Sequence, residues 1–171
     1  EIAIVLHDGE KVIDQYQTLI NPERSIPAFI TGLTGITNEM VSDAPLFCEV
    51  AKEIVLRTEG AVFVAHNARF DYGFLREEFG RLGYAYTRKQ LCTVRLSKKL
   101  LPQLKSHSLD SLIRYFSLDV DKRHRALDDA LATAEVFKII TGMGQGQREM
   151  SDIINMGIKE AKLPATISLD F

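Results

Sequence analysis

Two aspartates, Asp71 and Asp129, stand at predicted helix starts, on faces that otherwise carry apolar residues. At about 100° per residue, Asp129 falls inside the apolar arc of the helix predicted from Ala126, whereas Asp128 falls on the polar side. Asp71 falls near the middle of the apolar arc of the helix predicted after Asn67. An unpaired carboxylate carried into a core is costly, so each acid needs a cation, a metal or a hydrogen-bond network.

A helix start also favours a carboxylate for structural reasons, because the unpaired N–H groups and the helix dipole stabilise it. Glu78 falls in the second apolar arc as well, so the pattern does not select functional acids alone. Each aspartate nevertheless follows strand-like sequence or a loop, which is where open α/β sheets place their sites. The spacing therefore leaves a structural and a functional interpretation open.

A histidine, His124, lies five residues before Asp129 in the basic segment Asp121-Lys-Arg-His-Arg125. Because the pKa of histidine lies near working pH, His124 next to a helix-start carboxylate could serve as a general base. The neighbouring cations could bind phosphates. The alternative is a solvated, charged loop, and the segment by itself does not decide between the two.

The segments that must position these residues alternate between strand-like and helical patterns. Strands are predicted at 2–6, 11–20, 61–65 and 91–94, with a hairpin turn between the first two. Helices are predicted at 45–60, 67–82, 108–117 and 126–140, with shorter helical pieces before residue 37 and up to residue 101. Strands that alternate with helices predict a mixed α/β sheet.

The composition is that of an ordinary globular chain. The 171 residues fit one domain. The net charge of −2 with a pI of about 6.1 excludes a protein that coats nucleic acid through a generally basic surface. Any nucleic-acid contact must therefore come from a local site. Two cysteines, Cys48 and Cys92, are too few for a disulfide framework, so we expect a reducing cytoplasm. No apolar run approaches the length of a membrane span, and no membrane partner is expected.

Two segments together resemble the DEDD-type 3′–5′ exonucleases of the branch with a catalytic histidine, which includes the proofreading epsilon subunits of bacterial DNA polymerase III. The segment from Ala65 to Leu75, AHNARFDYGFL, is similar to the second motif of that family. The segment from His124 to Ala130, HRALDDA, is similar to its third motif. The resemblance covers residues 1–141 and implies a ribonuclease-H-like α/β fold, with a central mixed β-sheet flanked by helices.

The resemblance also implies a metal-dependent site. Family members hold two divalent metal ions, Mg²⁺ or Mn²⁺, with four acids, an arrangement suited to phosphodiester hydrolysis. By resemblance, Asp71 and Asp129 are metal ligands and catalytic residues, and His124 is the general base. Leu33, Thr34, Asn67 and Phe70 are the residues expected to contact the substrate.

The implied reaction is the release of 5′-mononucleotides from single-stranded DNA 3′ ends, in replication proofreading or repair. One alternative is an exoribonuclease that trims RNA 3′ ends, since discrimination depends on a 2′-OH contact. Another is a catalytically inactive module that binds nucleic acid or protein. The inactive module is supported by the absence from residues 1–171 of the family's first motif, Asp-x-Glu-Thr-Thr-Gly, which supplies two of the four acids. The retained Asp71, His124 and Asp129 argue against it, because an inactive site has no need of a general base.

The start of the chain resembles the strand that follows this first motif, so Glu1 is not expected to be the catalytic glutamate. Asp8 and Glu10 copy the letters Asp-x-Glu but are expected in a hairpin turn. Our hypothesis is that a strand carrying the motif lies upstream of Glu1. Residues 142–171 are expected to form a linker, a helix and a tail, leading to a fused nuclease domain or to a polymerase subunit.

Overall fold

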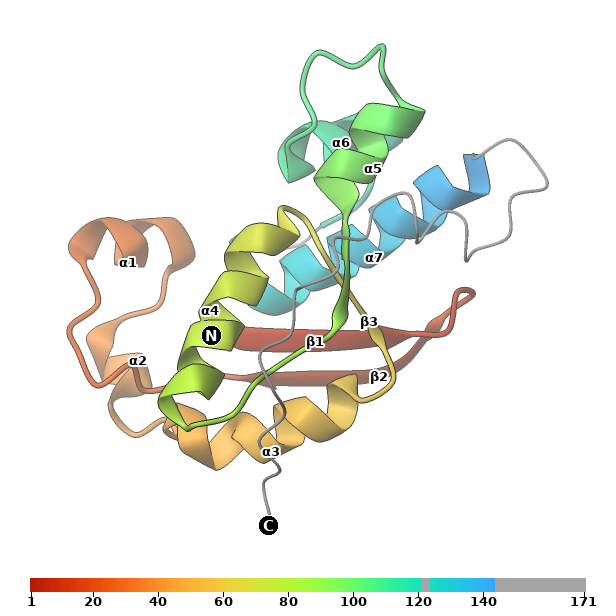
Figure 1. Cartoon of the computed structure of the whole chain (residues 1–171). Coiled ribbons are helices and arrows are strands. Elements are labelled where there is room, and N and C mark those ends of the chain that lie inside the picture. The colour runs from red at the N-terminus through yellow and green to blue at the C-terminus, as the bar shows by residue number, and fades with distance from the viewer. Residues whose placement is uncertain (121–123, 144–171) are drawn as a thin grey trace.

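The computed structural model describes residues 1–120 and 124–143, which contain strands and helices in the order expected of an α/β protein (Figure 1). The strands are β1 (Ile2–His7), β2 (Val12–Thr18), β3 (Val62–Ala65) and β4 (Lys89–Cys92). The helices are α1 (Ala28–Thr34), α2 (Asn38–Ser42), α3 (Phe47–Thr58), α4 (Ala68–Arg81), α5 (Thr93–Leu100), α6 (Leu109–Phe116) and α7 (Ala126–Met143). The α/β class is confirmed, and the expected linker, helix and tail at 142–171 lie almost wholly outside the described residues.

Strands β1 and β2 form the expected antiparallel hairpin, in which Ile2 pairs with Thr18. The turn is fixed by the side chain of Asp8, whose Oδ1 accepts the backbone N–H groups of Glu10 at 2.8 Å and of Lys11 at 2.9 Å. Side chains of this kind stabilise turns by replacing backbone partners. Asp8 and Glu10 therefore belong to an exposed turn, as the sequence indicated.

Strands β3 and β4 form a parallel pair, in which Ala65 lies opposite Cys92. The predicted strand at 91–94 is displaced, because Thr93 and Val94 already belong to α5. The Thr93 hydroxyl donates to the Ala65 carbonyl at 3.4 Å and lies 3.0 Å from His66 Nδ1. These tertiary contacts override the β propensity of Thr93 and Val94.

Two hydrophobic clusters hold the elements together. The first, here the α5–α7 cluster, joins β4 to three helices; its fully buried members are Leu91, Leu96, Leu112, Val136 and Ile140. The second, here the α3–α4 cluster, contains Val50, Ala51, Ile54, Tyr72, Phe79 and Tyr86, with Ile2 and Ile4 of β1 packed against it. The hairpin and α4 therefore share one core.

The apolar arc predicted for α4, which comprises Tyr72, Phe74, Leu75, Phe79 and Leu82, is correct only in part. The helix buries Ala68, Tyr72 and Phe79, whereas Phe74 is 60% exposed and Leu82 is 41% exposed. The sequence pattern weighted every large apolar residue as a core residue, although exposed apolar side chains are common. Asp71 consequently lies at the edge of the buried face and not at its middle.

The α3–α4 cluster provides a stability prediction. Ile54 is fully buried, so Ile54→Ala removes buried methyl groups and leaves a cavity, which should lower the free energy of unfolding by about 2–5 kcal/mol. Leu56→Ala, on the same helix at 55% exposure, is the matched control and should cost well under 1 kcal/mol. Urea denaturation of both variants measures the difference, and equal losses would show that Ile54 is not a core residue.

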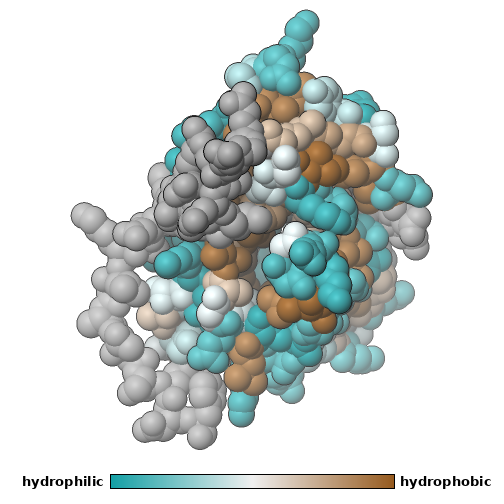
Figure 2. Space-filling model, turned by 90° about the vertical axis from the view of Figure 1, so that its right-hand side faces the viewer, coloured by the Kyte–Doolittle hydropathy of each residue, from teal (hydrophilic) through white to brown (hydrophobic). Residues whose placement is uncertain are grey.

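The surface mixes polar and apolar residues. Figure 2 shows one face on which hydrophobic residues lie in separate patches between hydrophilic ones. Within residues 1–120 and 124–143, no helix combines the length and the apolar character that a bilayer span requires.

Candidate active site

The turn from β3 into α4 places the first candidate acid. Asn67, directly before α4, adopts a left-handed conformation with φ of 72° and ψ of 50°, a region in which asparagine is enriched among non-glycine residues. Its carbonyl accepts the N–H of Phe70 at 2.8 Å. This turn starts the helix so that Asp71 falls in its first turn.

The Asp71 carboxyl is partly withdrawn from water, although the residue as a whole keeps exposed surface. Desolvation raises the pKa of this carboxyl, and its hydrogen bond to the Asp71 backbone N–H opposes that effect only in part. A carboxylate that has lost hydration gains from a nearby cation. Asp71 is therefore suited to hold a divalent metal ion, whose charge would offset the lost hydration.

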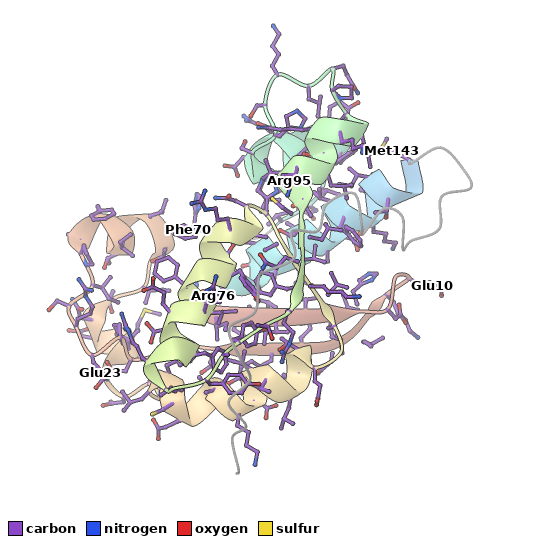
Figure 3. The ribbon with its side chains drawn as sticks, viewed as in Figure 1. Glu10, Glu23, Phe70, Arg76, Arg95 and Met143 are labelled. Carbon is purple, nitrogen blue, oxygen red and sulfur yellow. The ribbon has the colours of Figure 1, made fainter. Side chains whose placement is uncertain are left out.

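A cavity of about 410 Å³ opens beside this helix start, lined by Asn67, Arg69, Phe70, Gly73, Phe74 and Glu77. The rings of Phe70 and Phe74 meet edge to face with centroids 5.0 Å apart, and both side chains are about 60% exposed. Figure 3 labels Phe70 at the N-terminal end of α4. Exposed aromatic rings beside a cavity offer a stacking surface for a nucleobase.

The start of α7 places the second candidate acid next to the candidate base. Asp129 lies in the first turn of α7, and its backbone N–H donates to the Arg125 carbonyl at 3.0 Å. The backbone N–H of His124 points to Asp129 Oδ1 at 3.4 Å, and His124 adopts a φ of 66° with an exposed side chain. The structure therefore joins His124 and Asp129 in one compact turn.

Sequence reasoning missed Glu1 as a structural partner of this turn. Its side chain is only 4% exposed and pairs with the Arg125 guanidinium, at 2.6 Å from Nη2 to Oε1 and 3.1 Å from Nε to Oε2. Glu1 Oε2 also accepts the backbone N–H of Ala126 at 2.8 Å. Glu1 thus binds the first residue of α7 and the residue after His124. The sequence signal that could have indicated this role of Glu1 is its position directly before an apolar strand.

The Glu1 carboxylate predicts a pH dependence of stability. Burial alone would raise the pKa of Glu1, but hydrogen bonds from Arg125, Ala126 and Gln17 outweigh it and lower the pKa to about 2. A lowered pKa stabilises the fold above the unfolded value of 4.5, and this contribution is lost as pH falls toward 2. We expect a loss on the order of 2 kcal/mol after solvent screening, measurable by urea denaturation from pH 5 to pH 2.5. A Glu1→Gln variant lacks this titration, and an unchanged pH profile in it would contradict the assignment.

The substrate residues expected from the sequence lie in two places. Asn67 and Phe70 line the cavity, whereas Leu33 and Thr34 lie on α1 and are not among its lining residues. Leu33 is 53% exposed. The Thr34 hydroxyl donates to the Ile30 carbonyl at 2.9 Å and accepts the Ile36 N–H at 3.1 Å, so it shapes the end of α1.

The two helix starts are connected through the core. Ile2, next to Glu1, and Tyr72, next to Asp71, belong to the α3–α4 cluster. In the part of the chain that the structure describes, no three histidine, cysteine or acidic side chains gather closely enough to hold a metal ion. Asp71 and Asp129 are thus two separate carboxylates, whose helix starts are linked through Glu1 and β1 and not through a direct contact that joins the two acids.

The sequence model of the RNase T exonuclease family matches residues 1–137, which includes both helix starts. The chain belongs to this exonuclease family. The family match and the α/β fold confirm the resemblance drawn from the two motifs, while the individual site residues stay predictions.

Three relatives show how far the similarity extends. The chain is 42% identical over 137 residues to a PolC-type DNA polymerase III of Caldanaerobacter subterraneus, covering 80% of this chain and 10% of the polymerase. It is 38% identical over 138 residues to the 3′-5′ exonuclease DinG of Bacillus subtilis, covering 80% of this chain and 15% of DinG. The solved structure of exonuclease X in complex with 5′ overhanging duplex DNA has 27% identity and a TM-score of 0.67, and covers 89% of this chain and 87% of that one. The chain thus spans a small part of the two longer relatives.

Proposed function

We propose that this chain is a metal-dependent 3′–5′ exonuclease domain that hydrolyses DNA from its 3′ end and releases 5′-mononucleotides. The observation that carries the proposal is the pair of acids in the first turns of α4 and α7, with His124 joined to the second, in a chain matched by the exonuclease family. DNA is favoured over RNA because one relative is a DNA polymerase and a solved relative holds duplex DNA. We assign the activity to replication proofreading or repair in the cytoplasm.

In this proposal Asp71 and Asp129 are ligands of divalent ions, Mg²⁺ or Mn²⁺. The residue types fit, because carboxylate oxygens suit hard divalent cations and each helix start offers one such group. Such ions supply Lewis acidity toward the phosphodiester and its attacking water. His124, exposed beside Asp129, takes the proton of that water at a ring nitrogen.

The 3′-terminal base enters the cavity beside α4 in this proposal. Phe70 and Phe74 offer their rings to it, and Asn67 at the cavity wall offers hydrogen-bonding atoms. Leu33 on α1 supplies a further exposed apolar contact, and Thr34 holds the end of α1 in place. Phe70→Ala should raise KM for single-stranded DNA about tenfold, which corresponds to the lower end of one base–aromatic stack. An unchanged KM in steady-state kinetics would remove Phe70 from the substrate site.

We further propose that a segment preceding Glu1 adds a strand and two acids to this site. Strands β1 and β3 each pair with one neighbour, β2 and β4, and residues of both pack on the α3–α4 cluster, as Ile4 and Phe63 do. A strand inserted between β1 and β3 would join the two pairs into one mixed sheet. The full gene product should then unfold at higher temperature than residues 1–171 and show greater activity; equal values would reject this segment.

The wider assembly is proposed on the relatives alone. Because the chain covers 10% of a PolC-type polymerase and 15% of DinG, we propose that it works inside a larger protein or beside a polymerase subunit. A fused C-terminal nuclease domain is the arrangement that the sequence after residue 141 favours. Co-purification of the protein with polymerase subunits would support the arrangement beside a polymerase subunit.

The activity is tested by product analysis. The full gene product is incubated with single-stranded DNA in Mg²⁺, in Mn²⁺ and in EDTA, and the products are separated by chromatography. We expect 5′-mononucleotides with either metal and none in EDTA. A matched RNA strand should be degraded more slowly. Binding of DNA without any release of nucleotides in either metal would instead identify a binding module.

A further inference from the structure

Positive charge gathers in one part of this acidic chain. Between residues 89 and 114 the only acid is Asp110, whereas the basic residues are Lys89, Arg95, Lys98, Lys99, Lys105 and Arg114. The whole chain carries a net charge of −2, so the remaining residues are clearly acidic in balance. A local excess of cations in an acidic protein indicates a surface for an anionic partner.

Three of these cations share the exposed face of α5. The helix buries Thr93, Leu96 and Ser97 against the protein, which leaves Arg95, Lys98 and Lys99 on the opposite, exposed side. In the described ranges, none of these three side chains forms an ion pair. They are therefore available to a ligand.

The stability of α5 does not account for Arg95. Lys98 and Lys99 lie in the last turn, where a cation is favoured by the helix dipole. Arg95 lies in the first turn, where the dipole disfavours a cation, and that turn contains no acid to compensate. An arginine in this unfavourable place fits a role in binding, since its guanidinium matches phosphate geometry.

The helix begins at the candidate active site. Cys92, directly before α5, pairs with Ala65, and the Thr93 hydroxyl lies 3.0 Å from His66 Nδ1 in the segment that leads to Asn67. Figure 3 labels Arg95 on α5 and Phe70 at the N-terminal end of α4. From Arg95 to Lys99 the helix rises about 6 Å, away from the site.

We propose that the exposed face of α5 binds the phosphates of the DNA strand that leads to the 3′-terminal nucleotide. This inference rests on the proposed function, because it assigns the terminal base to the cavity beside α4. The partner is a nucleic-acid backbone, since three unpaired cations in a row recognise repeated phosphates and read no base. The exposed face of α5 thus determines the affinity for longer strands and does not affect the rate of the chemical step.

The test compares two variants of equal charge change. Arg95→Ala, Lys98→Ala and Lys99→Ala are combined in one protein. Lys11→Ala, Arg81→Ala and Lys138→Ala, all exposed and outside α5, form the control. Binding of a fluorescent single-stranded 12-mer is measured in EDTA at several salt concentrations. The salt slope is the change in the logarithm of the binding constant with the logarithm of the salt concentration, and each phosphate contact contributes about 0.7 to its magnitude. The magnitude of this slope should therefore fall by about 2 in the α5 variant and change little in the control. Affinity at low salt should fall about tenfold or more in the α5 variant.

The outcomes separate this inference from the proposed function. Binding in EDTA needs no catalysis, so the salt slope tests the α5 face even if no nucleotide is released. If hydrolysis occurs, the α5 variant should raise KM for the 12-mer but leave the hydrolysis of a dinucleotide unchanged. Equal slopes in the two variants would overturn the inference. Binding of polyglutamate is measured as a second probe. If the α5 variant loses polyglutamate binding but keeps DNA binding, the inference is overturned and an acidic protein partner is indicated.

Discussion

Replacing Asp129 with asparagine should lower metal-dependent nucleotide release by about 10³-fold or more and leave the fold intact. Asparagine keeps the size of the side chain but removes the charge that would hold a divalent ion. The measurement is the initial rate of nucleotide release at saturating DNA. Asp71→Asn should have a similar effect, because both acids serve one site in this proposal.

A matched control lies one residue away. Asp128 is also in the first turn of α7, so Asp128→Asn loses the same favourable interaction with the helix dipole, about 0.3–1 kcal/mol. Its nucleotide release should stay within about twofold of the parent protein. The double variant Asp71→Asn with Asp129→Asn should be little worse than either single variant, since residues that act as a unit are not additive. Equal losses of activity in the Asp128 and Asp129 variants would contradict the assignment.

Removing the Glu1 carboxylate should destabilise the protein by about 2 kcal/mol and slow the reaction as well. Glu1→Ala leaves the Arg125 guanidinium and the Ala126 N–H without their partner, and such losses are large for buried pairs. The Arg125 side chain keeps 27% exposure, so part of the cost is recovered by water. Because this contact fixes the backbone on both sides of the turn from His124 to Asp129, kcat should fall while KM changes little.

The conservative variant separates the two roles of Glu1. Glu1→Gln retains an acceptor for the Ala126 N–H and should recover about half of the lost stability and much of kcat. Glu10→Ala, an exposed acid in the hairpin turn, is the control and should be nearly neutral. In a double-mutant cycle with Arg125→Met, a coupling free energy near zero would show that the ion pair contributes nothing.

The fold was predictable wherever local pattern decides structure. The helix expected at 67–82 is α4 at Ala68–Arg81, and the hairpin follows from Asp8 and Gly9 as expected. The strand expected at 91–94 lies at Lys89–Cys92 instead, because Thr93 bonds to Ala65 and His66 across the parallel pair. Such a contact between distant segments leaves no local pattern in the sequence.

The position of a candidate site residue was predictable where that residue lies in a local sequence motif. Asp129 falls on the face of α7 that buries Thr133, Val136 and Ile140, as the helical wheel indicated. For Asp71 the wheel was only partly right: Tyr72 and Phe79 are buried, but Phe74 is exposed beside a cavity and does not belong to the core. Glu1 could not be placed, because its partner Arg125 lies 124 residues away and a single sequence carries no record of that pairing.

The central claim is that the acids at the two helix starts support hydrolysis from a 3′ end. One time course tests it most directly, with the same single-stranded DNA labelled at its 3′ end in one reaction and at its 5′ end in the other. In Mg²⁺ the account predicts immediate release of the labelled mononucleotide from the 3′ end and a gradually shortening ladder from the 5′ label. Both signals should vanish in Asp129→Asn and persist in Asp128→Asn. Immediate release of a 5′-labelled mononucleotide, or full activity in Asp129→Asn, would contradict the account.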